Sequence, residues 1–311
     1  MVNYLVTGGA GFIGSHIATA LIERGDNVCV LDDLSSGFRS NLAHLGGKVE
    51  LIEADVADPV ALAQAVDGVE VIFHEAALAS VPASIRDPLA SHTACATATV
   101  NVLNAAQQAG VRRVVLAASS AAYGDQPKVS KQETDPLDPL SPYAAAKIAS
   151  EVYSQAFTKS LGLETVCLRY FNVYGPRQDP ASEYSAVIPI CVSKMLAGER
   201  PTVFGDGMQS RDFVFVADVA SANLLAAEST TANGQVINIA CGCQSTLLDL
   251  IAAINNALGT AIEPVFAEPR AGDVRDSLAD ISRARKLLGY EPAVNLTEGL
   301  ERSIDYYQSL A

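Results

Sequence analysis

The stretch that decides the fold of this 311-residue chain is Val6-Thr7-Gly8-Gly9-Ala10-Gly11-Phe12-Ile13-Gly14. An apolar run precedes it and a helical pattern follows it, which predicts a strand, a tight turn and a helix. Gly8 permits the turn, Gly11 lets a pyrophosphate approach the backbone, and Gly14 lets the helix pack closely on the strand. The N–H groups of the first helical turn, which includes Phe12 and Ile13, then offer partial positive charge to a phosphate.

An acidic residue at the end of the next predicted strand extends this pattern. Asp32 lies 18 residues after Gly14, where a carboxylate can accept hydrogen bonds from both ribose hydroxyls and would repel a 2′-phosphate. Asp33 adds negative charge beside it. We therefore expect dinucleotide binding, with NAD rather than NADP as the cofactor. The alternative is a purely structural turn, since glycines are common in turns.

Outward from this stretch, short apolar runs alternate with helical patterns that begin near Gly11, Pro59, Pro88 and Pro142. This alternation predicts an α/β protein with a doubly wound parallel (Rossmann) sheet. The strands are nearly continuous apolar runs, as burial on both faces requires. The expected strands are Tyr4–Thr7, Asn27–Leu31, Val49–Glu53, Val69–His74, Arg113–Ala118 and Thr165–Arg169.

The rhythm changes after residue 175, where a smaller C-terminal α/β substrate-binding cap is expected. Residues 1–175 are predicted to form the cofactor-binding domain and 176–311 mainly the cap, with about 213–240 returning to the first domain. The patterns predict helices at Ile188–Leu196, Leu247–Leu258 and Asp280–Leu287, and short strands at Pro201–Phe204 and Arg211–Val216.

Composition excludes several classes of function. The 21 Lys and Arg against 35 Asp and Glu give a formal charge of −14, which disfavours general binding to nucleic acids or anionic membranes. Neither a secretion signal nor an apolar run long enough for a membrane span is present, so a cytoplasmic location is expected. The six cysteines include no Cys-x-x-Cys pair, which favours free thiols over disulfides. The four scattered histidines predict no metal site.

The segment Tyr143-Ala144-Ala145-Ala146-Lys147 places a phenol and an ammonium on one face of a predicted helix. A free phenol is a weak acid, but a fixed ammonium beside it would stabilise the phenolate and let it act as a base. Ser119-Ser120 ends a predicted strand, at the edge where such sheets bind ligands. Either hydroxyl could hold a substrate oxygen against the tyrosine. Alone, the Tyr-x-x-x-Lys spacing also fits an exposed amphipathic helix.

With the glycine stretch, these residues resemble the extended short-chain dehydrogenase/reductase family over essentially the whole chain, and more narrowly its nucleotide-sugar 4-epimerases. Further matches are Asp55-Val56, His74-Glu75-Ala76-Ala77, Ser119–Gly124, Ser141–Lys147, Leu168–Gly175, Gly205-Asp206-Gly207, Arg211-Asp212-Phe213 and Arg270-Ala271-Gly272-Asp273.

The resemblance implies a role for each matching residue. Tyr143 would be the base, Lys147 its partner and a ligand of the nicotinamide ribose, and Ser119 the hydroxyl that aligns the sugar, with Ser120 as its competitor. Besides the residues already named, the implied cofactor ligands are Ser36, Gly37, Asp55, Val56, Ala76, Ala77 and Tyr170. The implied substrate ligands are Ser119, Ser120, Tyr143, Asn172, Val187, Val203, Arg211, Arg270, Asp273 and Ser277.

Two arginines in that set have an alternative role. Arg211 and Arg270 would neutralise a diphosphate, because guanidinium groups bind phosphate oxygens as forks. Arg211 could instead pair with Asp212 or Asp206, and Arg270 with Asp273.

The resemblance also implies a reaction, the 4-epimerisation of UDP-glucose and of its N-acetylated form through a transient 4-keto sugar. UDP-glucuronate 4-epimerase and decarboxylase activities are the alternatives on the same scaffold. A 4,6-dehydratase would need an acidic pair where Ser120, Ala121 and Ala122 stand. A non-catalytic nucleotide sensor typically lacks the Tyr or the Lys, and both are present.

Three positions depart from the usual pattern of the family. Cys95 stands where Asn is common, and it cannot reproduce the hydrogen bonds of Asn to a water beside the lysine. Ala98 stands where Gly is usual. Ser277 replaces a bulky Tyr of strict UDP-glucose epimerases, and this leaves room for a 2-acetamido group. The family also implies a homodimer, through a four-helix bundle of the helices around Thr93–Gly110 and Tyr143–Ser160, although both are Ala-rich and could equally pack internally.

Overall fold

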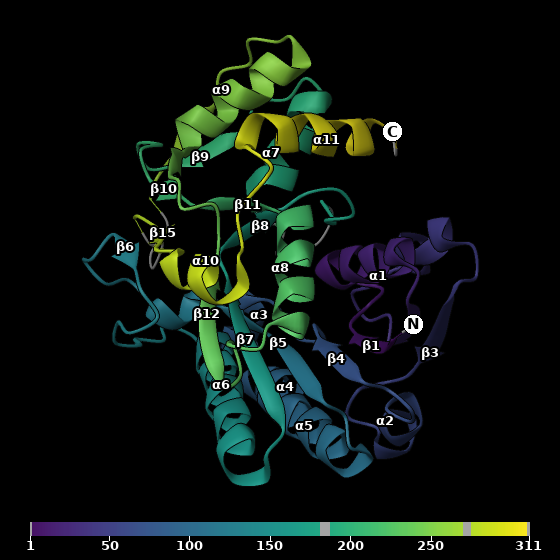
Figure 1. Ribbon diagram of the computed structural model, residues 1–311. Coiled ribbons are helices and arrows are strands. Elements are labelled where there is room, and N and C mark those ends of the chain that lie inside the picture. Colours follow the sequence, from purple (N-terminus) through teal and green to yellow (C-terminus); the bar gives the residue numbers. More distant parts are fainter. Residues whose placement is uncertain (1, 181–186, 270–274, 310–311) are drawn as a thin grey trace.

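The computed structural model describes residues 2–180, 187–269 and 275–309 (Figure 1). Its centre is a seven-stranded parallel sheet in the order β12-β7-β5-β4-β1-β2-β3, which confirms the doubly wound parallel fold. These strands are β1 (Asn3–Thr7), β2 (Asn27–Asp32), β3 (Val49–Glu53), β4 (Val71–His74), β5 (Arg113–Ser119), β7 (Glu164–Tyr170) and β12 (Gln235–Ile239).

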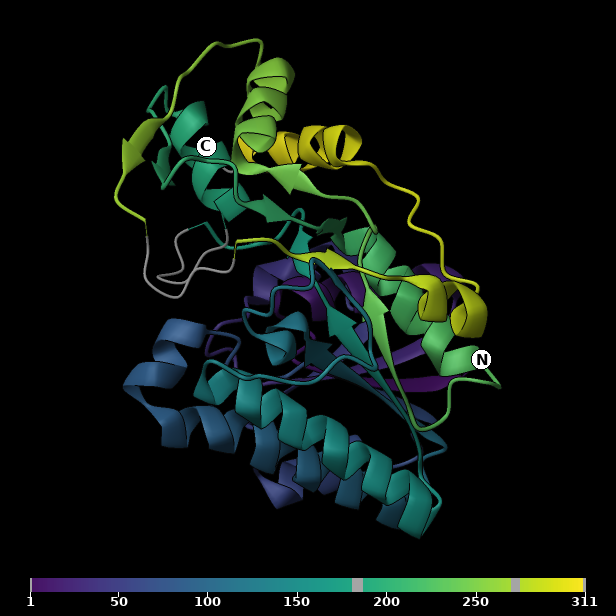
Figure 2. The same ribbon diagram turned by 90° about the vertical axis from the view of Figure 1, so that its left-hand side faces the viewer.

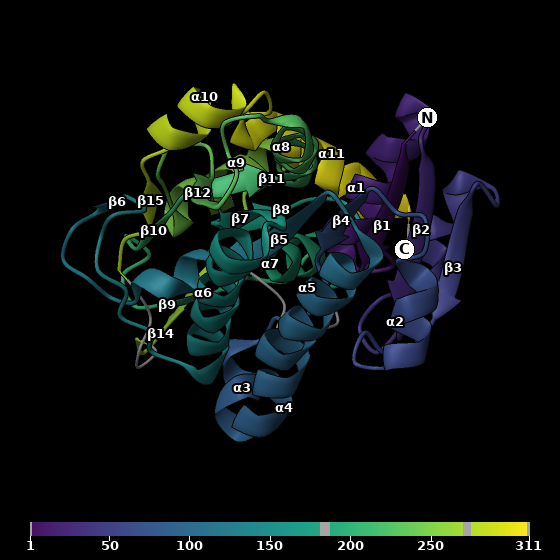
Figure 3. The same cartoon turned by 60° about the horizontal axis from the view of Figure 1, so that its bottom comes forward.

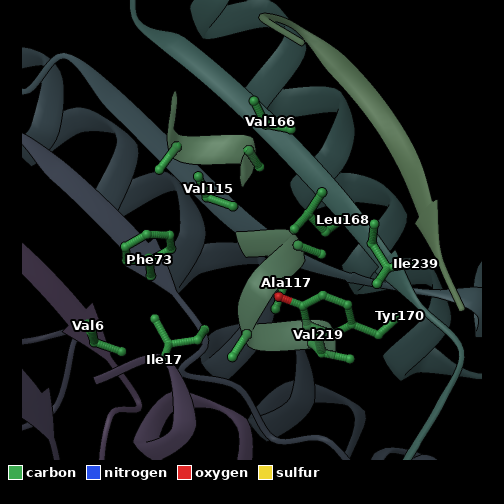
Figure 4. Packing of buried hydrophobic residues seen from close by; sticks show 14 of the residues in the cluster. Val6, Ile17, Phe73, Val115, Ala117, Val166, Leu168, Tyr170, Val219 and Ile239 are labelled. Carbon is green, nitrogen blue, oxygen red and sulfur yellow. The ribbon is translucent and has the colours of Figure 1, made fainter. Parts of the chain in front are cut away.

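Helices cover both faces of the sheet, and alternate residues of each strand reach opposite faces. Val6 and Phe73 pack with Ile17 and Val219 on the face that Figure 4 shows. Their neighbours on the strands pack toward α2 and α5 on the other face. Figures 2 and 3 show α5 and α6 side by side along that face. The helices of this part are α1 (Phe12–Arg24), α2 (Pro59–Ala65), α3 (Val81–Arg86), α4 (Pro88–His92), α5 (Ala98–Ala109), α6 (Pro142–Leu161), α8 (Val216–Glu228) and α10 (Ser282–Leu288).

Three short helical segments that are not α-helices complete this part of the chain. Two are 3-10 turns and one, between α4 and α5, is a π-helical turn. They are Arg39–Leu45, Ser120–Tyr123 and, as the π-helical turn, Thr93–Thr97.

The cap lies beyond the carboxyl ends of the strands, at the top of Figure 1. Its core is a separate cluster that includes Ile188, Met195, Phe215, Ile254 and Leu300. Its helices are α7 (Val187–Leu196), α9 (Leu247–Leu258) and α11 (Leu296–Ser309). The short strand pairs outside the main sheet are β8 (Asn172–Tyr174) with β11 (Phe213–Phe215), β9 (Thr202–Phe204) with β14 (Val265–Ala267), β10 (Ser210–Arg211) with β13 (Ser245–Thr246), and β6 (Ser130–Lys131) with β15 (Leu278–Ala279).

The single strand expected at Arg211–Val216 is wrong, because the chain changes partner at Asp212. The strand before it, β10, is antiparallel to β13, whereas β11 after it is parallel to β8. Asp212 is fully buried, and its carboxylate accepts hydrogen bonds from the backbone N–H groups of Cys241, Gly242 and Ala279. A buried acid thus ties three segments together where the ladder breaks. The sequence patterns also missed β12, an edge strand of the main sheet.

The six cysteines, all within the described residues, are free thiols, as predicted; three of them are buried and Cys243 is exposed. Within residues 2–180, 187–269 and 275–309, no helix is long and apolar enough to cross a membrane. In the same ranges, no three His, Cys, Asp or Glu side chains form a group that could hold a metal ion.

Candidate active site

The glycine stretch forms a cradle in which three positions have no room for a side chain. A Cβ on Gly8, whose φ is +68°, would lie 2.6 Å from the backbone nitrogen of Ala76. On Gly14 it would collide with the carbonyl of Gly8, and on Gly37 it would lie 2.8 Å from the backbone of Ala10. Helix α1 begins after Gly11 without a side-chain cap, so its first-turn N–H groups face the cradle unpaired by any side chain. This geometry suits a diphosphate.

Asp32 supports the cradle from the end of β2. Its carboxylate accepts hydrogen bonds from the N–H groups of Ala10 and Leu34 at 2.9 and 2.8 Å, which ties the glycine turn to the second strand. Burial raises the pKa of this carboxyl above its ordinary value. A carboxylate has about four lone-pair sites, so the Asp32 carboxylate retains acceptor capacity for a ribose hydroxyl. Asp33 is exposed and accepts from the backbone and hydroxyl of Ser35.

The other residues expected around the cofactor follow the carboxyl ends of the sheet strands. Asp55 and Val56 come after β3, Ala76 and Ala77 after β4, and Tyr170 ends β7. Ser36 is exposed in the loop that follows β2. The topology therefore brings all of them to one edge of the sheet, where ligands of such folds bind.

Helix α6 presents the expected catalytic pair. Pro142 occupies its first turn, and the hydroxyl of Ser141 caps it by accepting from the N–H of Ala144. Tyr143 is half-buried, and the side chain of Lys147, one turn later, is buried. The Lys147 Nζ donates to the carbonyl of Ala117 in β5 at 2.8 Å. This bond uses one of the three ammonium donors and fixes the charge against the sheet.

A buried ion pair anchors the same helix further along. Glu151, one turn after Lys147, accepts from Arg169 of β7 through both carboxylate oxygens, at 2.8 and 2.7 Å. Both side chains are 4% exposed. The Arg169 guanidinium also lies 4.8 Å from the ring centroid of Tyr123. Bidentate geometry fixes orientation as well as distance, so α6 cannot rotate without breaking the pair.

Ser119 and Ser120 occupy the end of β5 and the 3-10 turn that follows. The Ser119 hydroxyl accepts from the N–H of Ala121 at 3.2 Å and retains its own proton for donation. Ser120 is also half-buried. Both hydroxyls lie at the carboxyl edge of the strand that binds Lys147.

Glu75, which follows β4 beside the predicted cofactor residues, was assigned no role from the sequence. Its Oε1 accepts a hydrogen bond from the phenol of Tyr170 at 2.9 Å. The phenol oxygen in turn accepts from the side-chain amide of Asn223 in α8 at 2.8 Å. Burial raises the pKa of Glu75 to about 7, while the Tyr170 bond and the Lys147 charge oppose the rise. The His74-Glu75-Ala76-Ala77 match was the signal that could have indicated it.

A cavity of about 480 Å³ lies between β8, α7, β9 and the start of α9, within the size range of small-molecule pockets. Its lining includes the predicted substrate residues Asn172, Val187 and Arg211. Val203 does not belong to the lining: its side chain is 1% exposed and packs in the cap core. The cavity is mostly apolar, and its lining also includes residues that were not predicted as substrate ligands: Val173, Tyr174, Ile188, Ile190, Cys191, Lys194, Thr202, Phe204, Gln209, Phe213 and Leu247.

Arg211 does not form the ion pairs that the sequence left open. The Asp212 carboxylate is bound to backbone N–H groups, and Asp206 pairs with Arg275 at 3.1 Å. Arg211 instead donates to the carbonyls of Ser210 and Arg275. Ser277 is half-buried and donates its N–H to Ser210 at 3.1 Å. The other two predicted substrate residues, Arg270 and Asp273, lie outside the described residues.

Residues 4–240 match the model of the NAD dependent epimerase/dehydratase family. The chain belongs to this family. It is 41% identical over 309 residues to a UDP-glucose 4-epimerase of Mycolicibacterium smegmatis, covering 98% of both chains.

Solved structures agree with this membership. A UDP-N-acetylglucosamine 4-epimerase from Methanobrevibacter ruminantium M1, in complex with UDP-N-acetylmuramic acid, is 40% identical with a TM-score of 0.96, and the match covers 100% of this chain and 99% of that one. A UDP-glucose 4-epimerase from Thermotoga maritima, solved with UDP-glucose, is 39% identical with a TM-score of 0.94 over 99% of both chains. As a member of the NAD-dependent epimerase/dehydratase family, the chain uses NAD as its cofactor.

Proposed function

We propose that this family member is a UDP-hexose 4-epimerase that interconverts UDP-glucose with UDP-galactose and also accepts the N-acetylated forms. The observation that carries the proposal is the pair on α6. Tyr143 and Lys147 share one face of that helix, and the buried ammonium is held at 2.8 Å from Ala117 in the strand that ends at Ser119. This places a base, a cation and a hydroxyl at one edge of the sheet.

The cofactor residues support this proposal by their fit to NAD. We assign the diphosphate to the cradle of Gly8, Gly11 and Gly14 and the adenosine ribose to Asp32, whose carboxylate disfavours a 2′-phosphate. The assignment rests on glycines whose Cβ atoms would occupy the cradle. We further propose residues 1–175 as the cofactor domain and 176–311 mainly as the nucleotide-sugar domain, with about 213–240 returning to the first.

In the proposed mechanism each side chain has one task. The Tyr143 phenolate removes the proton from the sugar O4, and the fixed Lys147 ammonium stabilises the phenolate. A hydroxyl at the end of β5, Ser119 or Ser120, holds the same oxygen. When bound, NAD supplies the acceptance and return of a hydride at C4. After the 4-keto ring has rotated, Tyr143 would return the proton to O4 as a hydride returns to C4, so the net reaction would be redox-neutral.

The cap cavity supports a nucleoside diphosphate as the handle of the substrate. Its apolar walls suit a nucleobase, while Asn172 and Arg211 offer polar groups for the phosphates. We assign Val187 to the same subsite, but not Val203, whose side chain packs in the cap core. Arg270 and Asp273 are assigned to the diphosphate and the uridine ribose by resemblance. A small Ser277 leaves room for an acetamido group.

The test is an incubation of purified protein with UDP-glucose and UDP-N-acetylglucosamine, followed by NMR. The galacto products are expected from both, and Tyr143→Phe should lower the rate by about 10²–10⁴-fold, the usual contribution of a general base, with nearly unchanged NAD binding. Absence of both products, with NAD confirmed present, would refute the epimerase. UDP-glucuronate is included as a third test compound, because UDP-glucuronate 4-epimerase and decarboxylase activities are the alternatives on the same scaffold.

We propose that the enzyme is a homodimer built on α5 and α6, in the cytoplasm as its free thiols indicate. Large apolar side chains are exposed on α6 and on the neighbouring α3 and α4. They are Val152 and Tyr153 on α6, Ile85 on α3 and Leu89 on α4. Such an exposed set is typical of an interface. Analytical ultracentrifugation tests this assembly, and a monomer at micromolar concentration would contradict it.

A further inference from the structure

Cys95, one of the positions that depart from the family pattern implied by the resemblance, belongs to the π-helical turn Thr93–Thr97. Its thiol donates toward the carbonyl of Leu78, 4.0 Å away. Cys95 and Ala96 pack against Ala146 of the catalytic helix, together with Tyr143 and Ala77. The place of this turn therefore sets the surroundings of the proposed base and of the cofactor loop at the same time.

A chain of hydrogen bonds fixes the turn. The N–H of Ala76 donates to the Thr7 hydroxyl at 3.4 Å, and that hydroxyl lies 2.7 Å from His74 Nδ1. His74 Nε2 lies 3.3 Å from the Thr99 hydroxyl, which donates to the carbonyl of Cys95 at 2.7 Å. The last bond makes Thr99 an acceptor toward His74, and the network therefore assigns the proton of the imidazole to Nε2.

A branch of the same chain reaches the catalytic helix. The hydroxyls of Thr99 and Ser150 lie 3.0 Å apart, and Ser150 shares a face of α6 with Lys147, three residues earlier. Ser150 also contacts the carbonyls of Cys95 and Ala146, at 3.4 and 3.0 Å. Thr99 is thus the junction of strand β4, the π-helical turn and helix α6.

This junction is dry and uncharged. Thr99, His74 and Ser150 are each at most 2% exposed. Burial, and then the nearby charge of Lys147, lower the pKa of His74 to about 3. The imidazole is neutral at physiological pH, and a hydroxyl removed here leaves buried polar groups without partners.

We propose that Thr99 is a positioning residue, which through His74 and Ser150 holds the π-helical turn against α6 and so sets the place of Tyr143 and Lys147. This role rests on the proposed epimerase function. Cys95→Asn should accordingly give no gain in rate, because the hydroxyls of Thr99 and Ser150 already tie the π-helical turn to α6.

The decisive pair of variants is Thr99→Val and Thr99→Ser. Thr99→Val keeps the shape and removes the hydroxyl, and about a tenfold loss of kcat with little change in KM is expected, below the 10² of a 1 Å misplacement. Thr99→Ser should restore the rate. Thr97→Val, the same change at an exposed position of the π-helical turn, is the matched control. Should Thr99→Val fail to fold, Ser150→Ala removes the branch to α6 alone.

A second readout separates positioning from mere stability. Displacement of the Lys147 ammonium should move the acidic limb of the kcat–pH profile to higher pH. The part of the ultraviolet phenol titration that is missing in Tyr143→Phe, and therefore belongs to Tyr143, should move in the same direction. Besides Tyr143 and Glu151 on α6 itself, the titratable groups that feel the charge of Lys147 are His74, Glu75 and Cys167. Of the last three, Glu75 has a pKa of about 7, so the profiles are repeated with Glu75→Gln.

An unchanged pH profile in Thr99→Val, or a loss of rate that only follows the folded fraction, would overturn the positioning role. If the unaltered chain converts no UDP-sugar, the proposed function fails instead, and the ultraviolet titration still decides the role of Thr99.

Discussion

The proposed cofactor cradle is formed mainly by the consecutive residues Val6 to Gly14, with Gly37 and Ala76 packed against them, whereas the cap cavity is lined by five separate segments between residues 172 and 247. In the proposed cradle, backbone N–H groups and missing side chains would bind the diphosphate, and most of these groups are neighbours in sequence. In the cavity, side chains from β8, α7, β9, β10 and α9 must meet in space. The first region therefore depends on local steric fit, and the second on contacts that hold distant segments in register.

The largest effect is expected at the cradle, from Gly14→Ala. Its methyl group would collide with the Gly8 carbonyl, while that of Gly11→Ala would lie 3.1 Å from the same oxygen. We expect Gly14→Ala to weaken NAD binding by on the order of 100-fold, the scale of a 1 Å misplacement, and Gly11→Ala by less. Calorimetric titration of the apoprotein measures both. Equal losses for the two variants would show that space in the turn does not limit binding.

In the cap, Arg211→Met should raise KM for UDP-sugars about 10- to 100-fold and change kcat little. A charge-assisted contact to a phosphate contributes roughly 1.5–3 kcal/mol, and uniform binding appears in KM alone. Arg200→Met is the control, since Arg200 is exposed and donates to the backbone of Glu263 and Pro264. An equal rise in KM for both variants would remove Arg211 from the phosphate subsite.

The joint between the two regions is tested by Asp212→Asn. An amide offers one acceptor oxygen, so backbone N–H groups now bound by the carboxylate lose their partner at a cost of about 1–3 kcal/mol of unfolding free energy. Asp206→Asn makes the same change in an exposed pair, where only a small change in the free energy of unfolding is expected. Urea denaturation measures both. A variant at 212 as stable as the parent would mean that the strand crossover does not need the acid.

The smallest change is one of selectivity, from Ser277→Tyr. The larger side chain should lower kcat/KM for UDP-N-acetylglucosamine about tenfold relative to UDP-glucose, within the 1–3 kcal/mol that pocket shape supplies. Ser277→Ala should leave the ratio unchanged. If the ratio in Ser277→Tyr equals that of the parent, the residue does not limit the space at C2.

The patterns in the first half predicted six sheet strands because parallel strands are buried on both faces and leave unbroken apolar runs. They missed β12, and they joined β10 and β11 into one strand, because the exchange of partners at Asp212 depends on the distant Cys241, Gly242 and Ala279. The role of Thr99 was equally hidden, since its partners His74 and Ser150 are 25 and 51 residues away.

Neighbouring residues and the periods of helix and strand were enough to predict the glycine turn, the helix with its phenol and ammonium, and the family. The folded chain was needed to show which hydroxyls surround the catalytic helix, that the Val203 side chain lies in the core, and that Lys194 and Gln209 line the cavity. These features could not be read from local patterns because burial and hydrogen-bond partners depend on segments that meet only when the chain folds.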